Sequence, residues 1–266
     1  MPATTMMSET RQGLVAAGPG DFEPHHIPLG ALPRPPAGEA HAWLLDLGQL
    51  ARSLQHALGG DRAEDFDGDA RLTPGQLRFA RRFYLRLLLG AYLGIPGKSV
   101  HINRGERGKP VLDASRHSEP LHFSMAKSAD RLLIGLAFQV HLGVDLEPVA
   151  RRPRNALGVA RRYFSEPEAA ALSALPDESL DSVFLRTWAC KEAVVKASGH
   201  GIANQLHRFS VETDPRRPAA VLDFNGDDAK EWSLQVLSPE PGYLGAVAAR
   251  ARGLRIRAFR LLPADG

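Results

Sequence analysis

The chain has 266 residues, 44% of them hydrophobic, and a formal net charge of +3. This length is enough for one large or two small hydrophobic cores, and no apolar run approaches a membrane span, so we expect no membrane partner. The basic residues are spread out without interleaved aromatic residues, which argues against a nucleic-acid partner. The mild positive charge still permits an anionic partner.

The first residues and the cysteine content indicate a cytoplasmic protein. Residues 1–36 contain no apolar segment with a cleavage site, so the sequence predicts no secretory signal. Cys190 is the single cysteine, which leaves no intramolecular disulfide and suits a reducing compartment. Residues 1–38 are rich in Pro, Gly, Ser and Thr and predict a mobile N-terminal segment.

A capped helix is predicted over residues 74–93. Thr73-Pro74-Gly75-Gln76 supplies a capping box with proline at the first helical position, and Gly94-Ile95-Pro96-Gly97 ends the helix. One face carries three arginines spaced by four residues, Arg78, Arg82 and Arg86. Such a stripe either is solvated or faces phosphate groups, and the spacing alone leaves both open.

Strand patterns occupy much of the rest of the first half. Residues 41–47, 100–104 and the continuous apolar run 132–138 are predicted strands. Alternation in Gly143-Val144-Asp145-Leu146-Glu147 predicts another strand. It places Asp145 and Glu147 on one face, one pleat apart.

A second long helix is predicted over residues 180–198, with Gly199 at its C-terminal cap. Trp188, Glu192 and Lys196 are spaced by four and share one face. Taken alone, this is a surface ion pair beside a core tryptophan. Together with the two carboxylates of the preceding strand, Glu192 completes a plausible site for a hard cation.

The remaining segments alternate as an antiparallel meander, with strands predicted at 209–211, 232–237, 243–249 and 254–261. Each half of the chain therefore contains one long helix and several short strands, without regular βαβ alternation. We expect an α+β fold of two similar lobes with antiparallel sheets, related by a pseudo-two-fold axis. The N-terminal lobe spans 39–140 and the C-terminal lobe 141–262, with a site at their interface.

Two of these segments resemble the paired signatures of the 4'-phosphopantetheinyl transferases, namely Gly143 to Glu147 and Trp188 to Lys196. They occur in the family's order, with Asp145 and Glu192 separated by 47 positions (192 − 145). Gly108-Lys109-Pro110 and the arginine helix are similar to the N-terminal half of the longer, monomeric subfamily, which activates peptide and polyketide synthases. The resemblance covers roughly residues 72–202.

The resemblance implies a reaction and a set of roles. Phosphopantetheine passes from coenzyme A to a serine of an apo acyl or peptidyl carrier protein, and 3',5'-adenosine bisphosphate leaves. Mg²⁺, or Mn²⁺, is expected on Asp145, Glu147 and Glu192, with Glu192 as candidate base for the serine proton and Lys196 near the leaving phosphate. Five further cations are expected to hold the phosphates of coenzyme A: Arg82, Arg86, Lys109, Lys127 and Lys191.

One departure from the family pattern falls in Ser124-Met125-Ala126-Lys127-Ser128. Lys127 stands where the family has a histidine that contacts the 3'-phosphate, and Ala126 replaces a serine. Lysine still supplies a point charge to a phosphate, without imidazole geometry. Two other functions stay open on the sequence: a non-catalytic protein of the same fold that binds coenzyme A or a nucleotide, and a metal-dependent hydrolase of a pyrophosphate.

Overall fold

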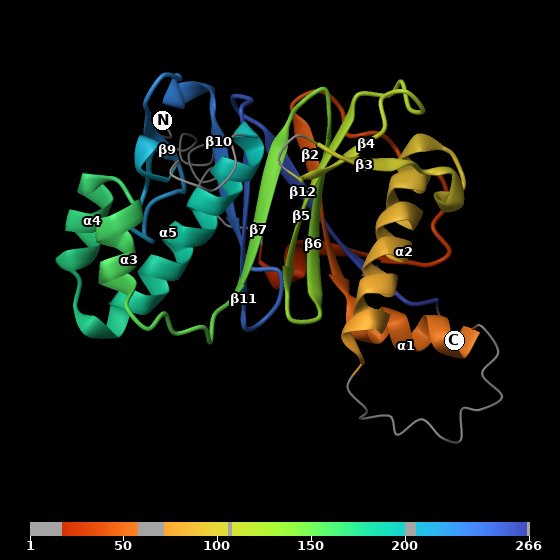
Figure 1. Cartoon of the computed structure of the whole chain (residues 1–266), viewed down its shortest axis with the longest axis horizontal. Coiled ribbons are helices and arrows are strands. Elements are labelled where there is room, and N and C mark those ends of the chain that lie inside the picture. Colours follow the sequence, from red (N-terminus) through yellow and green to blue (C-terminus); the bar gives the residue numbers. More distant parts are fainter. Residues whose placement is uncertain (1–17, 58–71, 106–107, 200–205, 265–266) are drawn as a thin grey trace, which may run out of the picture.

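The computed structural model describes residues 18–57, 72–105, 108–199 and 206–264. Within them, two β-sheets lie face to face and each carries helices on its outer side (Figure 1). The larger sheet has the strand order β1 (Phe22–His26), β12 (Arg255–Leu262), β2 (Glu39–Asp46), β6 (Arg131–Phe138), β5 (Leu121–Ser128). The smaller has the order β10 (Ser233–Leu237), β11 (Tyr243–Ala249), β7 (Leu142–Pro148).

Two hairpins and the helices complete the described chain. The hairpins pair β3 (Ile102–Arg104) with β4 (Pro110–Leu112), and β8 (Phe209–Val211) with β9 (Val221–Phe224). The α-helices are α1 (Leu47–Ala57), α2 (Pro74–Leu93), α3 (Ala156–Tyr163), α4 (Glu166–Ser173) and α5 (Asp177–Ser198). Short 3-10 turns occupy Pro19–Asp21, Gly97–Ser99, Leu206–Arg208 and Ala229–Glu231.

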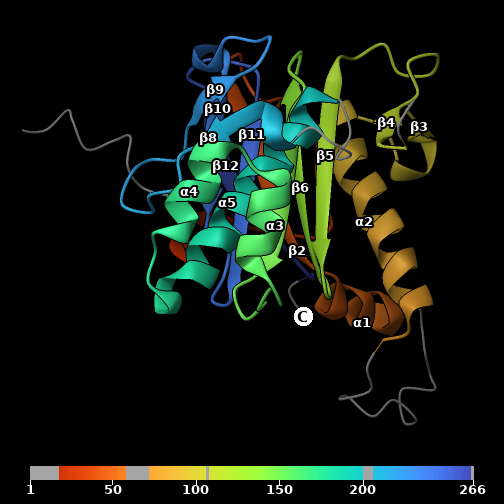
Figure 2. The same cartoon turned by 60° about the vertical axis from the view of Figure 1, so that its left-hand side comes forward.

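The apolar residues form three cores, one between each pair of neighbouring layers. Helices α1 and α2 cover the larger sheet through residues such as Trp43 and Tyr84. The inner faces of the two sheets meet through residues such as Leu133 and Val144. Helix α5, with α3 and α4 beside it, covers the outer face of the smaller sheet (Figure 2). The expected α+β class is thereby confirmed, while the pseudo-two-fold relation between lobes stays a prediction.

Helix α2 has the limits predicted from its caps. The Thr73 hydroxyl accepts a hydrogen bond from the Gln76 amide at 3.2 Å, and the Gln76 side chain accepts one from the Thr73 amide at 2.7 Å. Gly94 ends the helix in the left-handed region, with φ of 67°, where glycine is favoured. Helix α5 begins three residues before the predicted Leu180.

Two segments lie elsewhere than the sequence predicted. Strand β12 was expected in the C-terminal lobe, but it pairs in parallel with β2 and with β1 in the larger sheet. Residues 22–26, placed in a mobile segment, form strand β1 at the edge of that sheet; residues 1–17 lie outside the described residues. In the described part of the chain, no helix has the length and apolarity needed to cross a membrane.

Candidate active site between strand β7 and helix α5

Strand β7 and helix α5 cross closely because glycine occupies position 143. A Cβ added to Gly143 would lie 2.0 Å from the Ala193 carbonyl oxygen and 2.4 Å from the Ala197 amide nitrogen. With no side chain in between, the helix backbone packs directly on the strand. The crossing brings Glu192 of α5 within electrostatic range of Asp145 on β7.

Lys196 connects the two elements through an ion pair. Its Nζ donates to Asp145 Oδ1 at 2.7 Å and to the Val144 carbonyl oxygen at 3.1 Å. Glu147, two residues further along the strand, accepts a hydrogen bond from Arg151 at 2.5 Å. The Arg151 guanidinium also lies 5.9 Å from the centre of the Trp188 ring. The site is therefore three acidic side chains with one cation bonded to each of two of them.

Burial raises the pKa of all three carboxyl groups. The pKa of Glu192 rises to about 7, because the group is buried and because Asp145 and then Glu147 add negative charge nearby. Burial also raises the pKa of Asp145, against the opposing effect of Lys196. These groups share one negative field that a bound cation would relieve.

The donor set fits a hard cation such as Mg²⁺. Asp145 Oδ2 is buried and has no hydrogen-bond partner among the described residues, although a buried carboxylate oxygen normally has one. Carboxylate oxygens are the ligands that Mg²⁺ prefers. In the described part of the chain, no three His, Cys, Asp or Glu side chains converge on one point. Lys196 and Arg151 are bonded to Asp145 and Glu147 in this structure.

An arginine-lined pocket of about 1020 Å³ lies between α2 and the β3–β4 hairpin. Met125 of strand β5 also lines it, and Lys127 lies two residues further on the same strand face, exposed. Five arginines line the pocket: Arg78, Arg81, Arg82, Arg86 and Arg104. The predicted Arg82 and Arg86 are thus brought together with further cations, in a setting suited to an anionic, phosphate-bearing ligand.

Comparison with known proteins shows which family the chain belongs to. A family model described as the 4'-phosphopantetheinyl transferase superfamily matches residues 141–248, which include both β7 and α5. The chain is 33% identical over 242 residues to the 4'-phosphopantetheinyl transferase HetI of Nostoc sp., covering 84% of this chain and 94% of that protein. This chain belongs to the 4'-phosphopantetheinyl transferase superfamily.

Two more distant members of the superfamily are also similar to the chain. One is the human L-aminoadipate-semialdehyde dehydrogenase-phosphopantetheinyl transferase, 26% identical over 238 residues, with 81% of this chain and 76% of that protein covered. The other is the 4'-phosphopantetheinyl transferase psf-1 of Bacillus pumilus, 27% identical over 166 residues, with 62% and 67% covered.

The expectation that Lys191 of this transferase holds a phosphate is wrong. Lys191 is fully buried, and its Nζ donates to the two oxygens of Glu168 at 2.8 and 2.6 Å and to the Phe209 carbonyl oxygen at 2.7 Å. Burial lowers its pKa to about 8, against the opposing charge of Glu168. The residue neighbours Glu192 in sequence but projects toward α4 and β8, so it holds the fold together rather than meeting a ligand.

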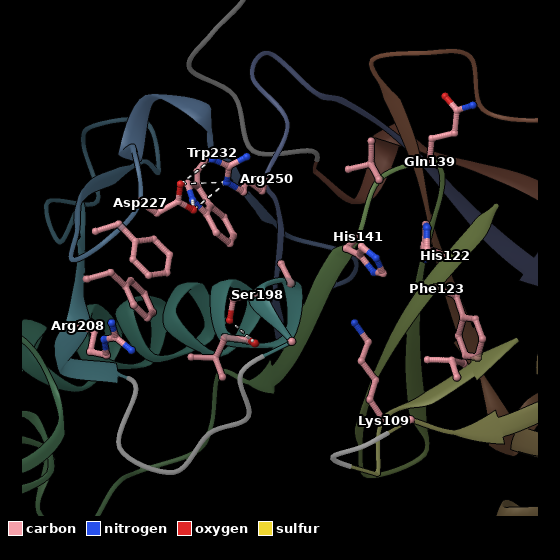
Figure 3. Close-up of a pocket in the computed structure, with 18 of the residues that line it drawn as sticks. Lys109, His122, Phe123, Gln139, His141, Ser198, Arg208, Asp227, Trp232 and Arg250 are labelled. Carbon is pink, nitrogen blue, oxygen red and sulfur yellow. Dashed lines mark hydrogen bonds and ion pairs between the residues drawn. The ribbon is translucent and has the colours of Figure 1, made fainter.

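Lys109 also differs from its expected role. It lies at the wall of a second pocket, of about 800 Å³, near the C-terminal end of α5 (Figure 3). Its ammonium donates to the carbonyl oxygens of Leu142, at 3.0 Å, and Lys196, at 2.8 Å. In this structure the charge of Lys109 is directed at two backbone carbonyls, and the residue does not line the arginine pocket.

Sequence reasoning overlooked several residues that the structure places at the site. Arg104 lies on β3 and lines the arginine pocket. Its position four residues before the Gly108 turn is the sequence feature that could have indicated this. Arg151 was not among the predicted site residues, yet it bonds Glu147. No sequence pattern pointed to Glu168 as the partner of Lys191.

Proposed function

We propose that this protein transfers 4'-phosphopantetheine from coenzyme A to a serine of an apo carrier protein, with Mg²⁺ as cofactor and 3',5'-adenosine bisphosphate as product. The observation that carries the proposal is the buried carboxylate cluster at the β7–α5 crossing, in a chain that also has an arginine-lined pocket. Transfer of a phosphoryl group from a pyrophosphate needs stabilisation of charge on its oxygens, which cations beside a carboxylate-held metal supply.

Asp145, Glu192 and Glu147 would hold the metal, which supplies Lewis-acid stabilisation of the pyrophosphate when bound. Lys196 lies beside Asp145 and would neutralise the phosphate of the leaving group. Glu192 would accept the proton of the carrier serine, since a carboxylate in a buried, negative setting is the stronger base. The three acids and Lys196 thus divide metal binding, proton transfer and charge neutralisation.

The phosphate at the far end of coenzyme A would lie among the arginines. Arg82 and Arg86 project from one helix face into the pocket, and Arg104 faces it from β3. Lys127 would supply a further charge from β5, in place of the family's histidine. A carrier protein, acidic around its serine, would be attracted by the mild positive charge of the chain. We further propose that the protein acts as a monomer.

The test is to incubate the protein with coenzyme A, Mg²⁺ and an apo carrier, and to weigh the carrier by mass spectrometry. We expect the carrier to gain one phosphopantetheine, and the gain to disappear with a chelator or with the Asp145→Asn variant. A carrier of unchanged mass alongside cleaved coenzyme A would instead identify a hydrolase. Bound but intact coenzyme A, with an unmodified carrier, would identify a binding protein.

A further inference from the structure

Lys109 belongs to the β3–β4 hairpin, which forms one wall of the arginine pocket and is called the arm below. Its neighbours Gly108 and Pro110 line that pocket, whereas its own side chain leaves the arm in another direction (Figure 3). The arm is closed by backbone hydrogen bonds, from the Gly105 amide to the Lys109 carbonyl oxygen at 2.8 Å and from the Gly108 amide to the Gly105 carbonyl oxygen at 2.9 Å. The base of the Lys109 side chain is therefore fixed by the hairpin.

The two acceptors of the Lys109 ammonium belong to the two elements of the active site. Leu142 is the first residue of β7, three residues before Asp145, and Lys196 lies in the last turn of α5. Carbonyl groups in the last turn of a helix have no partner within the helix, and a cation there is favourable. One ammonium thus joins the arm, the start of β7 and the end of α5.

The backbone of Lys196 is held by Lys109 while its side chain is bonded to Asp145. A shift of the arm would therefore move both the wall of the arginine pocket and the residue that pairs with the central carboxylate. Burial, with the charge of Lys196 as a second cause, lowers the pKa of Lys109 to about 8. A buried ammonium of this kind depends on its acceptors to remain in place.

We propose that Lys109 is a positioning residue, which fixes the distance between the arginine pocket and the β7–α5 carboxylates without contacting the phosphates itself. The inference rests on the proposed transferase function. This role differs from the phosphate contact that family resemblance implies for Lys109. Substituting a residue that binds phosphate weakens the affinity for the ligand, whereas substituting a positioning residue lowers the rate of the chemical step. A misplacement of about 1 Å between reacting groups can cost on the order of a hundredfold in rate.

The experiment compares Lys109→Met with Lys98→Met, a matched control at an exposed lysine in the Gly97–Ser99 turn. The kcat for carrier modification is measured, together with the Kd of 3',5'-adenosine bisphosphate by calorimetry. We expect Lys109→Met to lower kcat by about tenfold to a hundredfold, while the Kd stays within about threefold of the wild type. The control should match the wild type in both. An unchanged kcat with a Kd raised tenfold or more would overturn the proposal and assign Lys109 to the phosphates.

Hydrogen exchange supplies a readout that is independent of transfer. Amides in the last turn of α5 and at the start of β7 should exchange faster in Lys109→Met than in the control. Equal exchange would contradict the role of Lys109 in holding these two segments. If Lys109→Met does not fold, Lys109→Arg keeps the charge and several donors, and should show a smaller loss of kcat with the same unchanged Kd. Wild-type protein that leaves the carrier unmodified would refute the transferase function. The exchange result would still decide whether Lys109 holds β7 and α5 in place.

Discussion

Lys191→Met should destabilise the protein by about 4 kcal/mol. The change removes three hydrogen bonds of a fully buried ammonium, two to Glu168 and one to the Phe209 carbonyl oxygen. Breaking a buried ion pair by removing one partner costs roughly 3–5 kcal/mol. Glu168 keeps donors from Ser165 and the Val211 amide, which favours the lower part of that range, and the unpaired Phe209 carbonyl adds about 1 kcal/mol.

Urea unfolding measures this loss, with Lys230→Met as the control at an exposed lysine. With a slope of about 2–3 kcal/mol per molar urea, a loss of about 4 kcal/mol lowers the midpoint by roughly 1.3–2 M. Adding Glu168→Gln to Lys191→Met removes the stranded charge, so the double variant should be less destabilised than the sum of the single changes, by about 1 kcal/mol or more. A Lys191→Met protein as stable as the control, but with a raised KM for coenzyme A, would refute the structural role and restore the phosphate assignment.

Four further outcomes are expected. Gly143→Ala forces a Cβ against the α5 backbone and should lower stability by roughly 3 kcal/mol in the same urea assay, and wild-type stability would contradict the close crossing. Asp145→Asn should keep the fold, seen by circular dichroism, but lose Mg²⁺-dependent transfer; a normal Mg²⁺ titration would remove Asp145 from the metal site. Lys127→Ala should raise the KM for coenzyme A by about tenfold to a hundredfold and leave that for 3'-dephospho-coenzyme A unchanged; equal effects on both substrates would exclude the 3'-phosphate contact. Burial, followed by the charges of His141 and Lys109, lowers the pKa of His122 from 6.5 to about 4. Between those pH values the unfolded chain binds a proton at His122 that the folded chain does not, so the stability of the wild type should fall as pH drops from 6.5 toward 4. The stability of the His122→Gln variant should fall less steeply over the same range.

Local signals in the sequence were sufficient for the two long helices, α2 and α5, and for the inner strands, whereas α1 and α3 were not predicted. The capping box at Thr73 and the glycine at position 94 fixed both ends of α2, because each acts through hydrogen bonds or dihedral angles within a few residues. Alternation placed Asp145 and Glu147 on one strand, and the spacing of Glu192 and Lys196 placed them on one helix face. These relations depend on periodicity alone, which a single sequence contains.

Pairing between distant segments was not predictable in the same way. Strand β12 has the alternation of a meander strand. After β11, however, the chain passes from the smaller sheet to the larger, where β12 pairs with β2, about two hundred positions earlier in the sequence. Its register is set by burial of residues such as Ala258 and Phe259 between layers, which no local pattern reveals. The short strand β1 was overlooked for a related reason, since Pro24 within it suggests a loop and is tolerated only because β1 is an edge strand.

Lys191, Lys196 and Lys109 illustrate why residue type alone does not assign a role. Lys191 and Lys196 are five positions apart on one helix, which turns their side chains by about 140° relative to each other. One therefore meets Glu168 of α4 in a buried ion pair, and the other meets Asp145 at the crossing. Lys109, from a distant hairpin, donates to two backbone oxygens. A lysine that the sequence predicts to bind phosphate can instead bond to a buried acid or to the end of a helix, when the fold places one of these next to its ammonium group. Arg82 and Arg86 both line a pocket, so their role in holding the phosphates of coenzyme A stays a proposal.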